Sequence, residues 1–294
     1  MQGNGTKFED FLAGEVRKYK GIAVPVKSSL LRRLLVKRLP CRKLHPNPED
    51  EFCDPKIGPN YGIVSQYERS IADSFHSTSR SSIDEPLTVE RIRPDGYMIL
   101  NGHHRWAASI RMNKRSVPVR IVNLTHEMDI RQMLENAKHH RRVTLDLNEV
   151  VFRTERDELT EKAPHFPLNR IFRENLHVGV AALLRYCSTH GYDIWVFTPD
   201  YYSVEYIRRL FKAYHVFVTG IVTGIGQKAR LEIGKKLRAL IASHYQCTVT
   251  IDAAGVLNIN EETGDYRQFK LTSHDAGWSQ EVIDILKSLD EERL

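Results

Sequence analysis

Residues 86–122 of the chain read PLTVERIRPDGYMILNGHHRWAASIRMNKRSVPVRIV, and this stretch decides the fold of the first half. The runs 86–92, 97–100 and 117–122 are short and rich in apolar residues, which is typical of strands. Between the last two, the spacing of apolar residues predicts a helix over 105–112. Strands and a helix in so short a space predict a compact α+β unit.

The dipeptide Asn101-Gly102 lies where the second strand gives way to the helix, near His103. Glycine allows a sharp turn there, and the first amides of the helix would point at whatever occupies the turn. Arg105 adds a forked donor, and His103 or His104 can add hydrogen bonds, so the sequence predicts a phosphate site. Alternatively, the two histidines are polar turn residues beside a packing helix, and spacing alone does not decide between these interpretations.

The length of the chain, 294 residues, predicts two domains. We expect an N-terminal helical extension over 1–33, an α+β domain over 34–125 and a connecting helix over 126–140. From residue 141 to 294 the pattern alternates between strand and helix, which predicts a parallel, Rossmann-like α/β sheet.

Short β-branched or aromatic runs mark the expected strands of this second domain, at 143–147, 193–198, 216–220 and 247–252, with helical patterns at 176–190, 204–213 and 227–243 between them. The glycines of GIVTGIGQK, residues 220–228, do not have the G-x-G-x-x-G spacing of a dinucleotide loop. We interpret that stretch as a turn before a helix.

The composition is that of an ordinary soluble protein, with 41% hydrophobic and 27% charged residues. A formal net charge of +6 is compatible with phosphate-bearing partners, although its two basic stretches, at 32–43 and 138–142, are more simply solvated faces. Four scattered cysteines without a C-x-x-C pair indicate a reducing compartment. No run reaches the roughly 18 apolar residues of a membrane span, so we expect a cytoplasmic protein without membrane contact.

The stretch 86–122 resembles the core of the ParB/sulfiredoxin superfamily, whose G-x-x-R-x-x-A helix start matches Gly102, Arg105 and Ala108. The upstream segment LHPNPED, residues 44–50, resembles the proline-rich segment of that family, so the likeness extends over about 34–125. It implies a nucleotide phosphate pocket that includes Asn101, with ATP or ADP as the ligand and CTP as a third candidate.

Within that superfamily the local likeness is greatest to free serine kinases, whose motif is Asp-Gly-His-His-Arg, and this chain has Asn101 in place of the aspartate. The resemblance implies phosphoryl transfer to serine or a similar small hydroxyl compound, with a glutamate of the early loop as general base. Glu49 or Glu51 could take that role. Alternatively, both belong to a solvated acidic loop.

Other members of the superfamily bind CTP and DNA and carry a helix-turn-helix after this domain. The sequence gives one helix over 126–140 and then a strand, so DNA is the less favoured partner. Sulfiredoxins place a reactive cysteine where this chain has His103, which argues against thiol chemistry.

The stretch RRVTLDLNEVVFRTE, residues 141–155, places Asp146 at the end of a strand and Asn148 two residues later. Ligands of open α/β sheets gather at the carboxyl ends of strands. The stretch resembles the first motif of the haloacid dehalogenase superfamily, Asp-x-Asp-x-Val/Thr. That likeness implies that Asp146 is a nucleophile and a Mg²⁺ ligand; without it, Asp146 is simply a strand-end capping residue.

Later segments extend the same resemblance: Thr198 and Lys228 would bind phosphate, and Asp252 would complete a Mg²⁺ site with Asp146 and Asn148. Asn148 replaces the aspartate that serves as general acid and base, and loss of such a group costs ~10² to 10⁴ in rate. The second domain is therefore a slow phosphatase, a phosphate sensor or, as we favour, a scaffold without chemistry.

Together these features predict an α+β ParB/sulfiredoxin-like domain followed by an α/β Rossmann-like, haloacid dehalogenase-like domain. The function they favour is a nucleotide-binding phosphotransferase acting on a small molecule. The alternative is a nucleotide-dependent DNA-binding or regulatory protein without catalysis. The sequence does not set the oligomeric state.

Overall fold

The computed structural model describes residues 3–74, 85–153, 159–225, 230–273 and 275–291. The chain is a mixed α and β protein that forms two compact units: one runs to Leu124 and includes Arg230, and the other holds the remaining described residues from Thr125 onward. The first unit thus ends close to the expected limit at 125. Residues 126–140, which we expected to connect the domains, group with the second unit.

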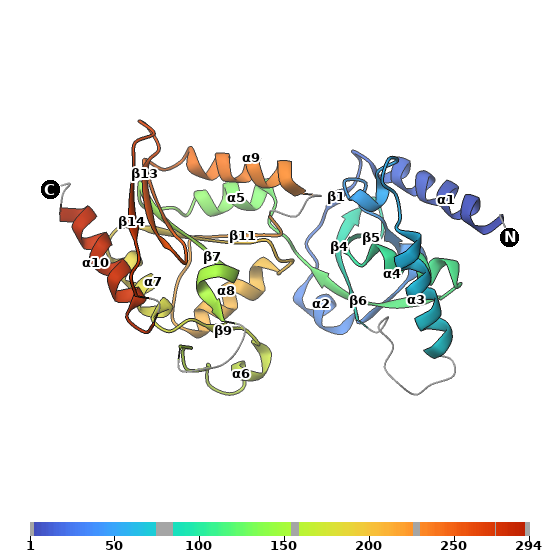
Figure 1. Cartoon of the computed structure of the whole chain (residues 1–294), viewed down its shortest axis with the longest axis horizontal. Coiled ribbons are helices and arrows are strands. Elements are labelled where there is room, and N and C mark those ends of the chain that lie inside the picture. The colour runs from blue at the N-terminus through green and yellow to red at the C-terminus, as the bar shows by residue number, and fades with distance from the viewer. Residues whose placement is uncertain (1–2, 75–84, 154–158, 226–229, 274, 292–294) are drawn as a thin grey trace. The chain divides into compact units, whose positions relative to one another are not determined.

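The first unit consists of a mixed sheet and the helices packed against it (Figure 1). Its helices are α1 (Gly3–Tyr19), α2 (Leu30–Leu35), α3 (Tyr61–Ser74) and α4 (His103–Arg111), with single 3-10 turns at Cys41–Lys43 and Glu51–Cys53. Its strands are β1 (Val24–Pro25), β2 (Arg38–Pro40), β3 (Leu44–His45), β4 (Leu87–Arg93), β5 (Tyr97–Asn101) and β6 (Ser116–Val122).

The sheet of the first unit has the order β2-β6-β4-β5-β3, and β1 pairs with the end of β4. The pairs β4–β6 and β3–β5 are parallel, whereas β4–β5 and β2–β6 are antiparallel. Helix α4 presents Trp106 and Ala107 to this sheet, where both are fully buried with Ile99 of β5. The junction between β5 and α4 is therefore fixed on both sides by the core.

The second unit contains a mostly parallel six-stranded sheet and a separate two-stranded sheet. Its strands are β7 (Arg141–Asp146), β8 (Phe152–Arg153), β9 (Asn175–Leu176), β10 (Asp193–Thr198), β11 (Gly220–Thr223), β12 (Cys247–Ile251), β13 (Gly255–Asn260) and β14 (Tyr266–Lys270). Its helices are α5 (Glu127–Leu134), α6 (Leu168–Ile171), α7 (Val180–Thr189), α8 (Val204–Ala213), α9 (Leu231–Ala242) and α10 (Trp278–Glu291), with one π turn at Leu147–Val151.

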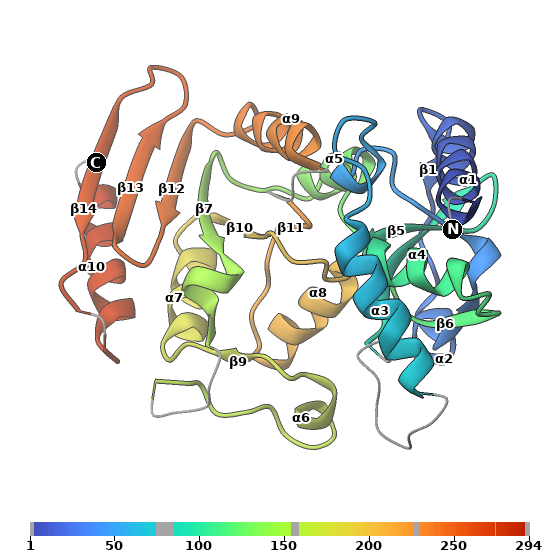
Figure 2. The same ribbon diagram turned by 45° about the vertical axis from the view of Figure 1, so that its right-hand side comes forward.

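The order of the main sheet is β11-β10-β7-β12-β13-β14, and its first four strands are parallel. From β7 the chain moves outward to β10 and β11, then returns to β12 on the other side of β7. The strand order therefore reverses between β7 and β12, which is where open α/β sheets bind ligands. The strands β12, β13 and β14 lie side by side at one edge (Figure 2).

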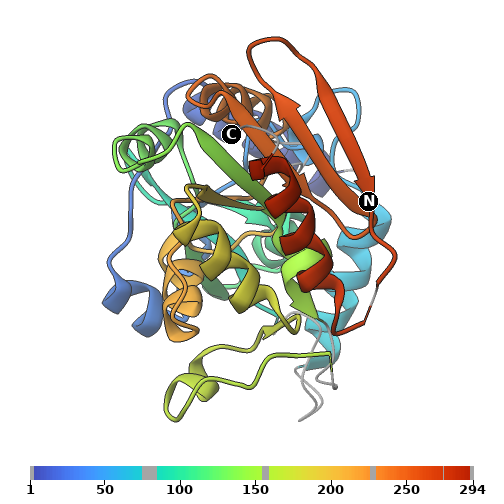
Figure 3. The ribbon, with the colours of Figure 1, turned by 90° about the vertical axis from the view of Figure 1, so that its left-hand side faces the viewer.

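Helices cover both faces of this sheet. Helices α5 and α9 lie side by side on one face (Figure 1), and α7 and α10 lie side by side on the other (Figure 3). The expected strand at 216–220 is displaced: β11 begins at Gly220, whose Cα pairs with Trp195. A Cβ at position 220 would lie 2.1 Å from the Trp195 ring, so this crossing requires glycine.

Candidate functional site

The β5–α4 junction carries the motif that the sequence singled out. Gly102 has a left-handed φ of 99° and caps α4, and a Cβ there would lie 2.4 Å from Cδ2 of Leu87. The first helical hydrogen bond runs from the Trp106 amide to the Gly102 carbonyl at 3.0 Å. The amides of residues 103–105 precede it, so they lack intrahelical partners and give the turn a partial positive charge.

The guanidinium of Arg105 folds back over this turn. The residue is 7% exposed, and a Cβ built on Gly102 would lie 3.1 Å from its Nη2. Its Nη1 donates to the carbonyl of Glu85 at 2.9 Å and to Glu85 Oε2 at 2.6 Å. The side chain of Glu85 is 72% exposed, so Arg105 binds an anionic group that is open to solvent. Such a forked donor suits phosphate oxygens equally well.

Both histidine rings hold the proline-rich segment 46–60 instead of facing the turn as donors. Nε2 of His103 accepts from the amide of Asn47 at 3.3 Å, and Nε2 of His104 accepts from the amide of Asn60 at 3.1 Å. The ring of Phe52 stacks on His103 with the centroids 5.4 Å apart and meets His104 edge-on. A phosphate-binding role for the two histidines stays a prediction.

Burial keeps both rings neutral at physiological pH. It lowers the pKa of His103 to about 4, although the charge of Asp50 raises this pKa in part. Oδ1 of Asp50 lies 3.7 Å from Nδ1 of the ring. Burial also lowers the pKa of His104. A neutral ring can accept from a backbone amide, whereas a protonated ring cannot. The attachment of segment 46–60 to α4 therefore depends on unprotonated histidines.

Acidification should loosen segment 46–60. Because the folded pKa of His103 lies below its ordinary value of 6.5, the neutral ring contributes its full stability above about pH 6.5, and this contribution is lost as the pH falls toward 4. Hydrogen–deuterium exchange of this segment, corrected for the intrinsic rate, should therefore be faster at about pH 5 than at about pH 7. In His103→Gln, which keeps an acceptor for Asn47 but does not titrate, this dependence should shrink to the part that His104 supplies. A native-like dependence in the variant would contradict the assignment.

The structure separates the acidic residues of this segment. Glu49 and Glu51 are exposed, whereas Asp50 is half-buried, caps the turn Glu51–Cys53 through the amide of Phe52 at 2.9 Å and lies nearest the histidines. Asn101 is exposed at the end of β5. The sequence did not reveal the roles of Asp50 and Glu85, because the contacts of Asp50 with His103 and of Glu85 with Arg105 join segments that are far apart in the chain.

In the second unit, Asp146 ends β7 and caps the π turn that follows. Its Oδ1 accepts from the amides of Asn148 at 2.7 Å and Glu149 at 3.1 Å. This is the capping role that a strand-end aspartate would have without any catalysis, and it leaves Oδ2 of the carboxylate outside these two bonds. π turns are rare and often occur at functional sites.

Asn148 is held in a three-residue network at the ends of β7 and β10. The Thr198 hydroxyl donates to Asn148 Oδ1 at 2.7 Å, and Asn148 Nδ2 donates to Asp200 Oδ2 at 2.8 Å. The amide of Asp200 donates to the Thr198 hydroxyl at 3.0 Å. The side chain at 148 must therefore both accept and donate, which an amide does and an ionised carboxylate does not. Asp200 was missed by sequence reasoning, since nothing in its local pattern marks it.

Asp252 follows β12, the other parallel neighbour of β7, and its Oδ1 accepts from the amides of Ala254 and Gly255, each at 2.7 Å. Lys228 lies outside the described residues. Within the described ranges, no group of three or more His, Cys, Asp and Glu side chains is arranged to hold a metal ion. Mg²⁺ binding by Asp146, Asn148 and Asp252 stays a prediction.

Comparison with known proteins adds one likeness. Residues 61–137, about a quarter of the chain, match the ParB N-terminal domain; they run from α3 through the β5–α4 junction to just past α5. Neither the curated proteins nor the solved structures give a match. In the parts of the chain that the structure describes, no helix has the length and apolar character needed to span a bilayer.

Proposed function

We propose that the first unit binds a nucleotide through its phosphates, at the amino end of α4. The observation that carries this proposal is the Arg105 guanidinium, which lies over Gly102 beside the free amides of α4 and holds the exposed carboxylate of Glu85. A phosphate displacing that carboxylate would meet the guanidinium and the positive end of the helix together. We expect ATP or ADP as the ligand, with CTP as the third candidate.

The chemistry we propose at this site is phosphoryl transfer to serine or a similar small hydroxyl compound. Glu49 and Glu51 are exposed on segment 46–60, whose backbone His103 and His104 hold against α4. That attachment supports a role for one of these glutamates as general base, since a base must reach within hydrogen-bond distance of the attacking hydroxyl. Asp50 lies closest to the histidines and is a third candidate.

Phosphorus NMR of the full chain with Mg²⁺ tests this chemistry. ATP, ADP and CTP are added in turn, with and without free serine. A new phosphomonoester signal that requires serine would support the kinase. If nucleotide binds but stays intact throughout, the proposal of a nucleotide site stands and the proposed phosphoryl transfer to serine is wrong.

The alternative, a nucleotide-dependent DNA-binding protein, rests on the likeness of residues 61–137 to the ParB N-terminal domain. Residues 123–140 contain a single helix, α5, which gives no helix-turn-helix after the matched strands. If duplex DNA is nonetheless a partner, its affinity must fall steeply with salt as counterions are released. A gel shift at several salt concentrations, with and without nucleotide, distinguishes the two functions.

We further propose that the second unit is a haloacid dehalogenase-like phosphate site with weakened chemistry. The support is that Asp146, Asn148 and Thr198 lie together at the carboxyl ends of the parallel strands β7 and β10, next to the point between β7 and β12 where the strand order reverses. Asp146 and Asp252 would hold Mg²⁺, which would neutralise a phosphoryl group. The amide of Asn148 positions Thr198 and Asp200 but cannot shuttle a proton.

Slow phosphatase activity is the result that this proposal predicts for the edge, whereas the scaffold that the sequence alone favours predicts none. With Mg²⁺, the chain should release p-nitrophenol from p-nitrophenyl phosphate at a rate ~10² to 10⁴ below that of an enzyme with an intact acid/base pair. Asp146→Asn should abolish the release, and Asp284→Asn, on the exposed face of α10, should not. Equal rates in both variants would show that Asp146 is not the nucleophile.

A further inference from the structure

Over β7 and β12, one face of the second sheet is polar where a covered parallel sheet is normally apolar, although the same face of β10 carries Trp195 and Phe197. Along β7 the side chains of Val143 and Leu145 belong to the apolar core, whereas Arg142 and Thr144 alternate with them and turn to the opposite face. Strand β12 repeats the pattern, with Val249 in the core. Parallel strands covered on both faces usually read as continuous apolar runs. This face therefore serves something other than packing.

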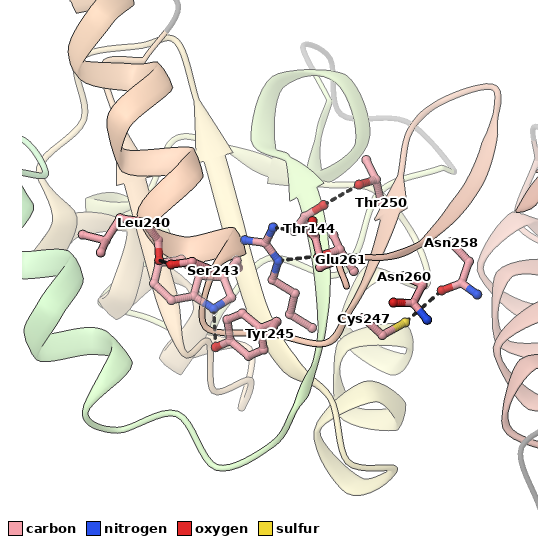
Figure 4. A network of polar contacts seen from close by, with 12 residues as sticks. Thr144, Leu240, Ser243, Tyr245, Cys247, Thr250, Asn258, Asn260 and Glu261 are labelled. Atoms are coloured by element: carbon pink, nitrogen blue, oxygen red, sulfur yellow. Dashed lines mark hydrogen bonds and ion pairs between the residues drawn. The ribbon is translucent and has the colours of Figure 1, made fainter. Parts of the chain in front are cut away.

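The polar residues of this face are buried and bonded to one another. Arg142 is 6% exposed; its Nε donates to the Thr248 hydroxyl at 2.8 Å, and its Nη2 donates to Glu261 at 3.2 Å. Glu261 also accepts from the Thr248 hydroxyl. Further along, the Thr144 and Thr250 hydroxyls bond at 3.0 Å (Figure 4). A buried ion pair is a costly substitute for apolar packing, so its presence calls for a reason other than stability.

A cavity of about 540 Å³ lies over this polar face, and we term it the β7–β12 cavity. It is distinct from a cavity of about 590 Å³ at the amino end of the sheet. Helix α9 lines the β7–β12 cavity through Arg238 and Ala239, β13 lines it through Ile259, and Glu261 follows directly after β13. The cavity is also lined by the carboxylate of Asp146 and by the ring of Phe197. The guanidinium of Arg238 lies over that ring. The volume is in the range of small-molecule sites.

The lining restricts the chemistry of a ligand. Arg142 and Arg238 only donate hydrogen bonds, whereas the carboxylates of Asp146, Glu149 and Glu261 only accept them. Without Mg²⁺, an inorganic anion would face the three carboxylates, and a simple cation would face the two guanidinium groups. Groups that both donate and accept satisfy both kinds of residue, and hydroxyls are such groups.

The threonine pair adds a further requirement. When one hydroxyl donates to the other, the second keeps its own hydrogen, so the Thr144–Thr250 pair can offer one more donor to the cavity. The Phe197 ring and Ile259 supply an apolar surface beside these polar groups. We propose that the β7–β12 cavity binds a small neutral polyhydroxylated compound, such as a monosaccharide or a cyclic polyol. This site is independent of the nucleotide site of the first unit, but it shares Asp146 with the phosphate site proposed for the second unit.

The test is an amide NMR titration of the full chain, without Mg²⁺, with D-ribose, D-glucose and myo-inositol in turn, and with inorganic phosphate as the anionic comparison. At least one polyol should shift the signals of Thr144 and Thr250 saturably. Thr250→Val, which removes one hydroxyl, should weaken that binding about threefold to tenfold. Thr189→Val, exposed at the end of α7, should bind as the native chain does.

Three results would overturn the proposal: no polyol shifts these signals, phosphate alone shifts them, or Thr250→Val binds with native affinity. Should Thr250→Val fail to fold, Arg238→Gln takes its place, because Arg238 is exposed on the wall formed by α9. It should weaken polyol binding, while Arg209→Gln, exposed on α8, should not. Equal affinities of these two variants would equally count against the site.

Discussion

Replacing Arg105 by alanine is expected to weaken nucleotide binding roughly a hundredfold, which is the loss of two charge-assisted hydrogen bonds to phosphate. The native guanidinium already holds one anionic group, since its Nη1 donates to Oε2 of Glu85 at 2.6 Å and to the Glu85 carbonyl at 2.9 Å. Isothermal titration of the full chain with ATP, ADP and CTP measures the effect, and thermal melting confirms that the variant is folded.

Three matched variants sharpen this result. Arg115→Ala removes an exposed arginine beyond the other end of α4 and should bind nucleotide normally. Arg105→Lys keeps the charge but loses the fork, so its affinity should lie between native and alanine. Glu85→Gln frees the guanidinium of its competing carboxylate and should strengthen binding. If Arg105→Ala binds nucleotide with native affinity, the proposed nucleotide site is wrong.

Gly102→Ala is expected to destabilise the first unit by about 2–4 kcal/mol, through backbone strain and overpacking together. The residue has a φ of 99°, and a Cβ would lie 2.4 Å from Cδ2 of Leu87, which is buried in the core. Relief requires the turn to move, and that displaces the amides of residues 103–105. The free energy of opening measured by hydrogen exchange in α4 reports the loss within this unit alone.

Gly21→Ala is the matched control for Gly102→Ala. Its φ is also positive, at 72°, but nothing lies within 4 Å of an added Cβ. It should therefore cost only about 1 kcal/mol, the ordinary penalty of a left-handed alanine. If the two substitutions cost the same, the contact with Leu87 is not what fixes the turn, and Gly102 is required for its φ alone.

Local patterning predicted the elements around the β5–α4 junction well. Expected strands at 86–92 and 97–100 correspond to β4 and β5, because apolar residues there alternate or cluster as a half-buried sheet requires. The helix begins at His103, as the Asn101-Gly102 turn indicated, two residues before the run at 105–112. No local pattern reveals that both histidine rings accept from amides of segment 46–60.

The hairpin β13–β14 was not predicted. Its second strand is largely exposed and reads Tyr-Arg-Gln-Phe-Lys, without the apolar alternation that marks a strand facing a core. Its pairing comes from the turn between Asn260 and Asp265, where the Asn260 amide donates to the Asp265 carbonyl at 2.9 Å. Such a strand is formed by its neighbour and not by its own sequence.

The candidate sites divide in the same way. Motif residues such as Gly102, Arg105 and Asp146 were found because a turn or a strand end marks them. Their partners Glu85 and Asp200 were missed, because tertiary contacts alone bring them to the sites. Asn148, which the sequence presents as a loss of chemistry, is an amide with a donor and an acceptor role in the structure.

An amide NMR titration of the full chain with ATP, ADP and CTP tests the nucleotide site most directly. The account predicts that at least one nucleotide shifts the signals of His103, His104 and Arg105 saturably, and that Arg105→Ala abolishes those shifts. A nucleotide that binds without perturbing these amides, or the absence of any shift with all three, would contradict it.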